Sequence, residues 1–208
     1  MVRMVVRPGE TDFDVEGRVQ GALDLPLTER GRGQVDEMLA VVRGQGVEVI
    51  YASPSEPALS TAIRIGAALD IVVKPLEGLS NLNQGLWQGM QHEEIRRKHP
   101  RVFKQWEELP ETVCPPEGES CDEAHDRILR VLKKPMRRGQ SFAVVASEPL
   151  ATLVISVLSD QNPKLPGPVP TRHGVERIVV GETFATSPAP AVPAPAPEPT
   201  PVLAPTFG

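Results

Sequence analysis

The chain has 208 residues, a formal net charge of −5, and 40% hydrophobic against 24% charged residues, proportions typical of a globular domain. This acidic balance argues against non-specific nucleic-acid binding, which requires a basic face, and no apolar run approaches the roughly 20 residues of a membrane-spanning helix. Residues 1–7 are too short and too charged for a signal peptide, so we expect a cytoplasmic protein with neither a nucleic-acid nor a membrane partner.

Short apolar segments alternate with longer amphipathic ones along the chain. A predicted strand over residues 1–6 ends at a Pro-Gly turn, and a helical pattern follows from Thr28 to Gly44. After a second strand at 47–51, a helix is predicted over 53–69, with Ser53 as its N-cap and Glu56 completing a capping box. The remaining predicted elements are strands at 71–73, 142–146 and 176–180 and helices at 91–105, 120–134 and 149–159.

This alternation predicts an α/β fold, a three-layer α/β/α sandwich with a mainly parallel central sheet. Ligands of such sheets bind beyond the carboxyl ends of the strands. Two of the predicted strand ends carry unusual sequences, Arg7-Pro8-Gly9 after the first strand and Ser147-Glu148-Pro149 after the strand at 142–146. We therefore expect the functional site at these two ends.

The cysteine content points to a reduced protein without a metal. Cys114 and Cys121 are too few for a disulfide framework, and no cysteine–histidine group has the spacing of a zinc site. We expect free thiols, no metal and no cofactor.

The C-terminal part of the chain is rich in proline, with eight of the 23 prolines between Pro188 and Pro205. Because proline lacks an N–H and fixes φ, this run suits neither a helix nor a central strand. We predict a folded domain over 1–183 and a disordered, polyproline-II-like tail over 184–208. The alternative is that the tail docks onto a proline-binding partner protein.

A series of motifs occurs within residues 5–34. The first strand leads into Arg7-Pro-Gly-Glu-Thr11, followed by Gly17-Arg-Val-Gln-Gly21 and by Pro26-Leu-Thr-Glu-Arg-Gly31. This run resembles the opening of the histidine phosphatase superfamily, phosphoglycerate-mutase-like branch, in which the first motif reads Arg-His-Gly-Glu-Thr. Looser similarities to that family follow in the same order at 51–62, 85–89, 116–120 and 144–147. The resemblance implies a phosphoglycerate-mutase-like fold for the whole domain.

The family's chemistry needs a histidine that attacks phosphorus, two arginines and a second histidine that neutralise the phosphoryl oxygens, and a carboxylate that handles the proton of the leaving oxygen. The resemblance places Pro8 at the nucleophile, Pro57 at the second arginine, Asn81 at the carboxylate and Ser147 at the second histidine. None of these side chains suits the family's step at its position. The resemblance therefore implies a degenerate member that lacks the catalytic histidines.

Arg7 is the part of the phosphate-binding set that is kept. A residual anion pocket that takes a phosphorylated or anionic small molecule weakly is predicted from Arg7, Gly9, Glu10, Thr11, Arg18 and Glu148. Within it the Glu148 carboxylate opposes such a ligand, by roughly 1 to 4 kcal/mol at about 4 Å. The replacements also have structural interpretations, because Pro57 fits a first helical turn and Ser147 fits the N-cap of the helix after it.

Other residues are weaker candidates for catalysis. His92, His99 and His125 lie on charged predicted helices and are interpreted as solvated or edge residues. His173 stands in an Arg-His-Gly triplet like the one that is lost, but it precedes a predicted strand instead of following one, which is the wrong context for a relocated nucleophile. Arg64 lies about 10 Å along the helix from Pro57, too far to replace the lost arginine.

These observations favour a catalytically inactive pseudophosphatase with a binding or regulatory role. Two alternatives stay open. The first is a residual or altered phosphomonoester phosphatase or mutase that uses another nucleophile. The second is a scaffold or interaction module that binds a partner through the proline-rich tail.

Overall fold

A computed structural model describes residues 1–169 and 171–178 of the chain. A five-stranded sheet lies at its centre in the order β3-β2-β4-β1-β5. The neighbours β3/β2, β2/β4 and β4/β1 are parallel, and β5 pairs antiparallel with β1. The strands are β1 (Arg3–Arg7), β2 (Val49–Ala52), β3 (Val72–Pro75), β4 (Phe142–Val145) and β5 (Gly174–Ile178). The predicted α/β class with a mainly parallel sheet is confirmed.

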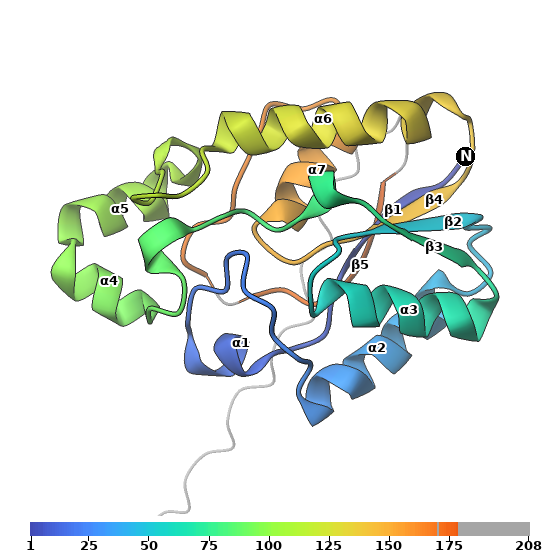
Figure 1. The fold of residues 1–208 in the computed structure, drawn as a ribbon, viewed down its shortest axis with the longest axis horizontal. Helices are drawn as coiled ribbons and strands as arrows, with labels where there is room; N and C mark the ends of the chain where they lie inside the picture. The colour runs from blue at the N-terminus through green and yellow to red at the C-terminus, as the bar shows by residue number, and fades with distance from the viewer. Residues whose placement is uncertain (170, 179–208) are drawn as a thin grey trace, which may run out of the picture.

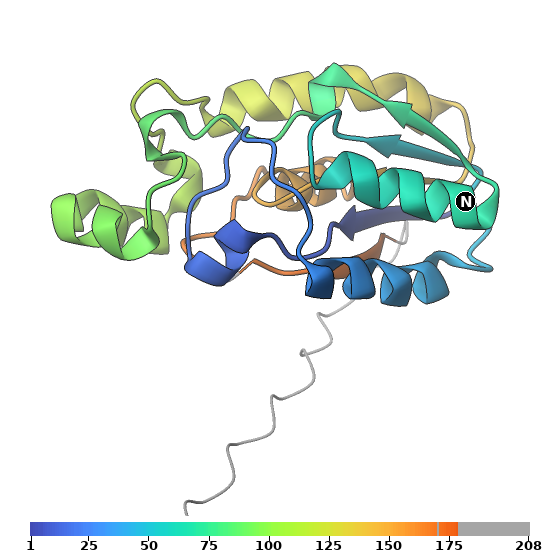
Figure 2. The same cartoon turned by 60° about the horizontal axis from the view of Figure 1, so that its bottom comes forward.

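Helices cover both faces of this sheet, α2 and α3 on one side and α6 and α7 on the other (Figures 1 and 2). The remaining helices, α1, α4 and α5, lie to one side, beyond the end of the sheet at which β1 ends (Figure 1). The helices are α1 (Asp12–Glu16), α2 (Glu29–Val42), α3 (Ala58–Leu69), α4 (His92–Lys98), α5 (Pro100–Glu108), α6 (Cys121–Arg137) and α7 (Leu150–Leu158), with 3₁₀ turns at η1 (Glu77–Leu79), η2 (Gly85–Trp87) and η3 (Pro110–Thr112).

The central strands are apolar on both faces because each face is buried by helices. On β1, Val5 packs into the cluster under α6 and α7, whereas Met4 and Val6 pack into the cluster under α2 and α3. Strands buried on both sides carry continuous apolar runs, as residues 142–145 also do. This double packing holds the carboxyl ends of β1 and β4 side by side.

Two predicted helices differ from the observed ones, and proline explains both. Helix α3 begins at Ala58, with Pro57 at its N-cap and no side-chain cap, so the predicted start at Ser53 is wrong. A helix capped by Ser53 would need the N–H of residue 57 for its first hydrogen bond, and proline has none. The predicted helix over 91–105 divides into α4 and α5 because Pro100 disfavours helical backbone at His99, which adopts φ −133° and ψ 58°.

Other local predictions have mixed outcomes. The capping box between Ser120 and Glu123 opens α6 as expected. Helix α1 was not predicted, although Thr11 and Asp14 form a capping box for it. The last strand is Gly174–Ile178, two residues earlier than the predicted 176–180, whose end lies outside the described residues.

The predicted tail at 184–208, and with it the boundary at residue 183, lies outside the described residues. Within the described ranges, no helix has the length and apolar character needed to cross a membrane.

Packing of α6 on the sheet can be tested with two leucines of the same helix. Leu132 is fully buried and Leu129 is 37% exposed. We expect Leu132→Ala to lower the free energy of unfolding by about 2–5 kcal/mol, because it leaves a cavity. Leu129→Ala should change it by less than about 1 kcal/mol. Urea unfolding followed by circular dichroism measures both values, and equal effects would contradict the assigned faces of α6.

Candidate functional site

The two strand ends singled out in the sequence meet in the structure. Val6 on β1 pairs with Val145 on β4, so the residues that follow these strands lie at one edge of the sheet. Arg7 closes β1, and its Nε donates a hydrogen bond of 2.5 Å to Oε1 of Glu148. The terminal Nη1 atom of Arg7 donates a hydrogen bond of 3.0 Å to Oε2 of Glu176 on β5. The Arg7 guanidinium is thus held between two carboxylates of the protein itself.

This ion pair is largely removed from solvent, since the side chains of Arg7 and Glu148 are 9% and 12% exposed. Burial lowers the pKa of the Arg7 guanidinium, but the charges and hydrogen bonds of Glu148 and Glu176 outweigh burial and raise that pKa above its ordinary value. Arg7 is therefore a permanent cation whose charge is compensated within the protein. Removing one partner of such a buried pair leaves an uncompensated charge and is strongly destabilising.

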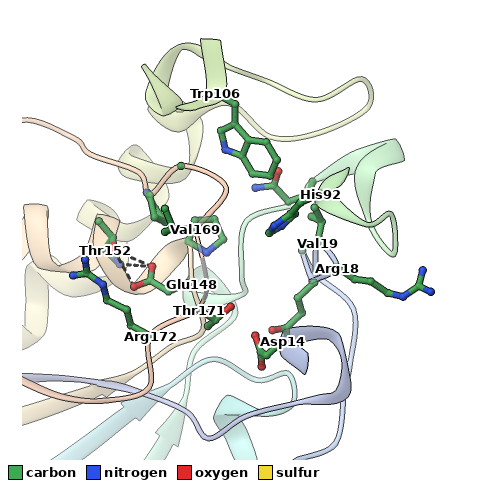
Figure 3. Close-up of a pocket in the computed structure, with 16 residues that line it drawn as sticks. Asp14, Arg18, Val19, His92, Trp106, Glu148, Thr152, Val169, Thr171 and Arg172 are labelled. Carbon is green, nitrogen blue, oxygen red and sulfur yellow. Dashed lines mark hydrogen bonds between the residues drawn. The ribbon is translucent and has the colours of Figure 1, made fainter. Parts of the chain in front are cut away.

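Glu148 also caps helix α7. Its carboxylate accepts hydrogen bonds from the Thr152 N–H at 3.2 Å and from the Thr152 hydroxyl at 2.9 Å (Figure 3). Helix α7 has Pro149 at its N-cap position without a side-chain cap, so the prediction that Ser147 caps this helix is wrong. Glu148, one residue before the N-cap, accepts a hydrogen bond from the first-turn N–H of Thr152, whereas Ser147 does not. The positive end of the helix also favours the negative charge of Glu148.

Asn81 is a structural link between three segments. Its Nδ2 donates to the carbonyl oxygens of Gly21 at 2.8 Å and of Glu148 at 3.0 Å. Its Oδ1 accepts from the Leu150 N–H at 3.4 Å, at the start of α7. A buried amide with its donors and acceptor engaged in this way holds the loop after β4 in place and has no proton to transfer.

His173 lies beside Pro8, contrary to the expectation that its place in the sequence is the wrong context. Strand β5 runs antiparallel to β1, with Gly174 opposite Arg7, so the residue before β5 reaches the edge at which β1 ends. The Nδ1 atom of His173 is 2.7 Å from the Pro8 carbonyl oxygen. Because a carbonyl only accepts hydrogen bonds, Nδ1 is the donor in this contact.

The loop after Pro8 packs against neighbouring backbone and is held by hydrogen bonds. A Cβ on Gly9 would lie 2.2 Å from the Gly31 carbonyl oxygen, so only glycine allows this approach of β1's end to α2. Glu10 accepts a hydrogen bond from the Thr28 hydroxyl at 3.0 Å, and Thr11 caps α1. Of the predicted residual anion pocket, these three residues and Arg7 do not line the cavity described next, whereas Arg18 and Glu148 do.

A cavity of about 360 Å³ opens beside Glu148 (Figure 3). It is formed by α1 and the loop after it, by the ends of α4, α5 and α7, and by the segment that leads to β5. Its lining consists of Asp14, Arg18, Val19, Gln20, Gly21, Gln84, His92, Trp106, Glu148, Pro149, Thr152, Pro166, Gly167, Val169, Thr171 and Arg172. This volume lies in the range of pockets that bind small molecules.

His92, interpreted from the sequence as a solvated or edge residue, lies at the edge of this cavity. Its ring is half-buried and stands edge-on to Trp106, with ring centroids 5.4 Å apart. Burial lowers the pKa of His92 below the ordinary value of 6.5. His92 opens α4 and shares a helical face with the fully buried Ile95, and that spacing of three residues was the available sign that it points inward.

The other sites considered in the sequence have structural roles. Pro57 occupies the N-cap position of α3. Arg64 pairs with Asp36 between α3 and α2, so Arg64 does not approach the Arg7 edge. Cys114 and Cys121 are free thiols. Among the residues that the structure describes, no group of three potential ligands could hold a metal ion.

Comparison with known proteins gives a consistent result. The model of the histidine phosphatase superfamily, branch 1, matches residues 4–173. The chain is 32% identical over 146 residues to phosphoserine phosphatase 1 of Hydrogenobacter thermophilus, which covers 70% of this chain and 69% of that protein. It is 33% identical over 146 residues to glucosyl-3-phosphoglycerate phosphatase of Mycobacterium tuberculosis, covering 70% of this chain and 61% of that protein.

The solved structures agree with this match. A mycobacterial glucosyl-3-phosphoglycerate phosphatase in complex with VO3 superposes with a TM-score of 0.74 at 25% identity, over 85% of this chain and 91% of the other.

The Arg7–Glu148 pair can be tested by removing the carboxylate. We expect Glu148→Ala to lower the free energy of unfolding by about 3 kcal/mol, because Arg7 stays buried without its main partner. Inorganic phosphate should then raise the Tm of this variant, since an anion can take the place of the carboxylate, and should leave the wild-type Tm unchanged.

Glu176→Ala is the matched control, because the Glu176 side chain is 46% exposed and its ion pair is worth about 1 kcal/mol or less. A Glu148→Ala variant as stable as the wild type would contradict the importance of the pair.

Burial of His92 predicts a pH dependence of stability. Because the pKa of His92 is lowered in the folded protein, the unfolded chain takes up the proton first as the pH falls below 6.5. The free energy of unfolding should therefore fall between pH 6.5 and the lower folded pKa, and this loss should be smaller in His92→Gln. Thermal unfolding near pH 7.5 and near pH 5.5 measures the difference, and the same loss in both proteins would contradict it.

Proposed function

The chain belongs to the histidine phosphatase superfamily, and we propose that it is a pseudophosphatase, which keeps the fold of the family, has lost its phosphotransfer chemistry and serves as a binding or regulatory domain. The ion pair between Arg7 and Glu148 is the observation that carries the proposal. It supports loss of phosphotransfer, because the Arg7 guanidinium, which the family resemblance assigns to the phosphoryl oxygens, is already paired with a carboxylate of the protein.

Phosphoryl transfer needs uncompensated positive charge where the negative charge of the transition state develops. Here the Arg7 guanidinium is paired with Glu148 and Glu176. A phosphate approaching Arg7 would have to displace the Glu148 carboxylate or lie next to it. Two like charges at about 4 Å repel by roughly 1 to 4 kcal/mol, depending on the local dielectric. Displacing the carboxylate would also remove the cap of α7.

Covalent catalysis needs a nucleophile, and proton transfer needs an acid or base of suitable pKa. Pro8 has no nucleophilic side chain, and its carbonyl accepts a hydrogen bond from His173. The Asn81 amide does not titrate at neutral pH and is engaged with Gly21, Glu148 and Leu150. Each position at which the family resemblance requires chemistry has instead a packing or hydrogen-bonding role.

A second candidate function is residual phosphomonoester hydrolysis, in which His173 replaces the lost histidine. It is favoured by the position of His173 beside Pro8 and by the relatives' names, which describe phosphatases. Against it, His173 does not line the cavity next to Glu148, and Arg7 is already paired. A binding role for the proline-rich tail at 184–208 and a cytoplasmic location stay predictions.

A turnover assay distinguishes the two functions. The purified chain is incubated with p-nitrophenyl phosphate and with 2,3-bisphosphoglycerate, and released phosphate and acid-labile phosphoprotein are measured. We expect neither, while the phosphoserine phosphatase of Hydrogenobacter thermophilus, run in parallel with phosphoserine, shows that released phosphate is detected.

The control variant is His173→Gln, which keeps a hydrogen-bond donor near Pro8. Turnover that is present in the wild type and lost in His173→Gln would overturn the pseudophosphatase proposal and support the second candidate. Turnover that is equal in both proteins would also overturn the proposal, and would show that the nucleophile is a residue other than His173.

A further inference from the structure

Several of the titratable groups that line the cavity beside Glu148 are neutralised by the protein itself. Glu148 is paired with Arg7, and Arg18 is paired with Glu16. Figure 3 shows the Arg18 guanidinium directed away from Glu148. Burial lowers the pKa of His92, so this ring is neutral at pH 7. These groups therefore offer no uncompensated charge to a ligand.

Two lining residues of opposite charge have no ion-pair partner among the described residues. They are Arg172, which is exposed on the segment that leads to β5, and Asp14, which is half-buried on α1. The Oδ2 atom of Asp14 accepts hydrogen bonds from the Thr11 N–H at 2.7 Å and from the Thr11 hydroxyl at 2.8 Å. These bonds orient the carboxylate, and its Oδ1 atom accepts none within the described part of the chain. Asp14 is thus a fixed anion that can still accept a hydrogen bond from a cation.

The two charges belong to opposite sides of the same opening. Figure 3 shows Arg172 on the side of Glu148 and Thr152, and Asp14 on the side of His92. Both residues line one cavity of about 360 Å³, so a single small molecule can reach both. A ligand in this cavity therefore meets a cation at one side and an anion at the other.

Apolar side chains form much of the remaining wall. Val19 is buried, Val169 is 51% exposed, and Trp106 is half-buried, with its ring centroid 5.1 Å from that of Trp87. Figure 3 shows Trp106 and Val169 around the same opening as the two charged residues. Such a wall favours an apolar middle part in the ligand, and the face of Trp106 also attracts an ammonium group.

We propose that this cavity binds a small zwitterion, an amine and a carboxylate joined by a short apolar spacer, with its ammonium at Asp14 and its carboxylate at Arg172. The inference rests on the proposed function, because it names the class of ligand for the binding role of a pseudophosphatase. A ligand with an anionic group alone would leave Asp14 unpaired and would be repelled by it, and a ligand with a cationic group alone would stand in the same relation to Arg172. A ligand that carries both charges pairs with both residues.

Linear ligands that differ in their charged ends test this proposal. The probes are 6-aminohexanoate, hexanoate and hexylamine, which near pH 7.5 carry both charges, the negative charge alone and the positive charge alone. Their binding to the full chain is measured by calorimetry and by protein NMR. We expect 6-aminohexanoate to bind about tenfold more tightly than either of the other two, the factor that corresponds to one charge-assisted hydrogen bond.

Two variants remove the charges one at a time. Arg172→Gln should lower the affinity for 6-aminohexanoate to about that for hexylamine. Asp14→Asn keeps an oxygen that can accept the Thr11 hydrogen bonds, and it should lower the affinity for 6-aminohexanoate to about that for hexanoate. The matched control is Arg138→Gln, because Arg138 is an exposed arginine that does not line the cavity, and it should leave the affinity unchanged. Melting curves establish that each variant is folded.

The outcomes separate this inference from the proposed function. Equal affinity for the three probes, or binding of none of them, overturns the inference and leaves the pseudophosphatase proposal intact. An effect of Arg172→Gln no larger than that of Arg138→Gln also overturns the inference. Turnover of p-nitrophenyl phosphate overturns the proposed function, and because the probes contain no phosphate, their binding is measured independently of it.

Discussion

The buried pair of Arg7 and Glu148 determines the character of this site. A guanidinium at the end of β1 is too costly to bury alone, so it needs an anion, and in a phosphatase the substrate supplies one. In this chain Glu148 supplies it from the end of β4, and the same carboxylate caps α7 through Thr152. One side chain thus satisfies the arginine and the helix end permanently. Under the proposed function, the native state needs no bound anion at Arg7, because the Glu148 carboxylate takes the place of one.

Retention of a family motif is a poor guide to retained chemistry when the motif also supports the fold. Gly9 allows the end of β1 to approach Gly31 in α2, and Glu10 and Thr11 anchor the loop through hydrogen bonds. These interactions cost several kcal/mol to lose whether or not a substrate binds. Pro8, at the position where the resemblance requires the nucleophile, is itself buried at the end of β1. The presence of Gly9, Glu10 and Thr11 is thus explained by packing and hydrogen bonding, whether or not the chain acts on a phosphate.

The sheet and both helical layers were predictable because apolar runs and amphipathic periods indicate which side chains are buried. Each such pattern lies within one short segment of the sequence. The adjacency of Arg7 and Glu148 followed from parallel strands sharing an edge. The start of α3 was missed because the cap at Ser53 looked complete, while the missing N–H of Pro57 decided the outcome. His173 was misplaced because the antiparallel direction of β5 is a property of the sheet, and no local pattern encodes it. Gln84 and Trp106 were missed because the cavity that both line is assembled from segments far apart in the sequence.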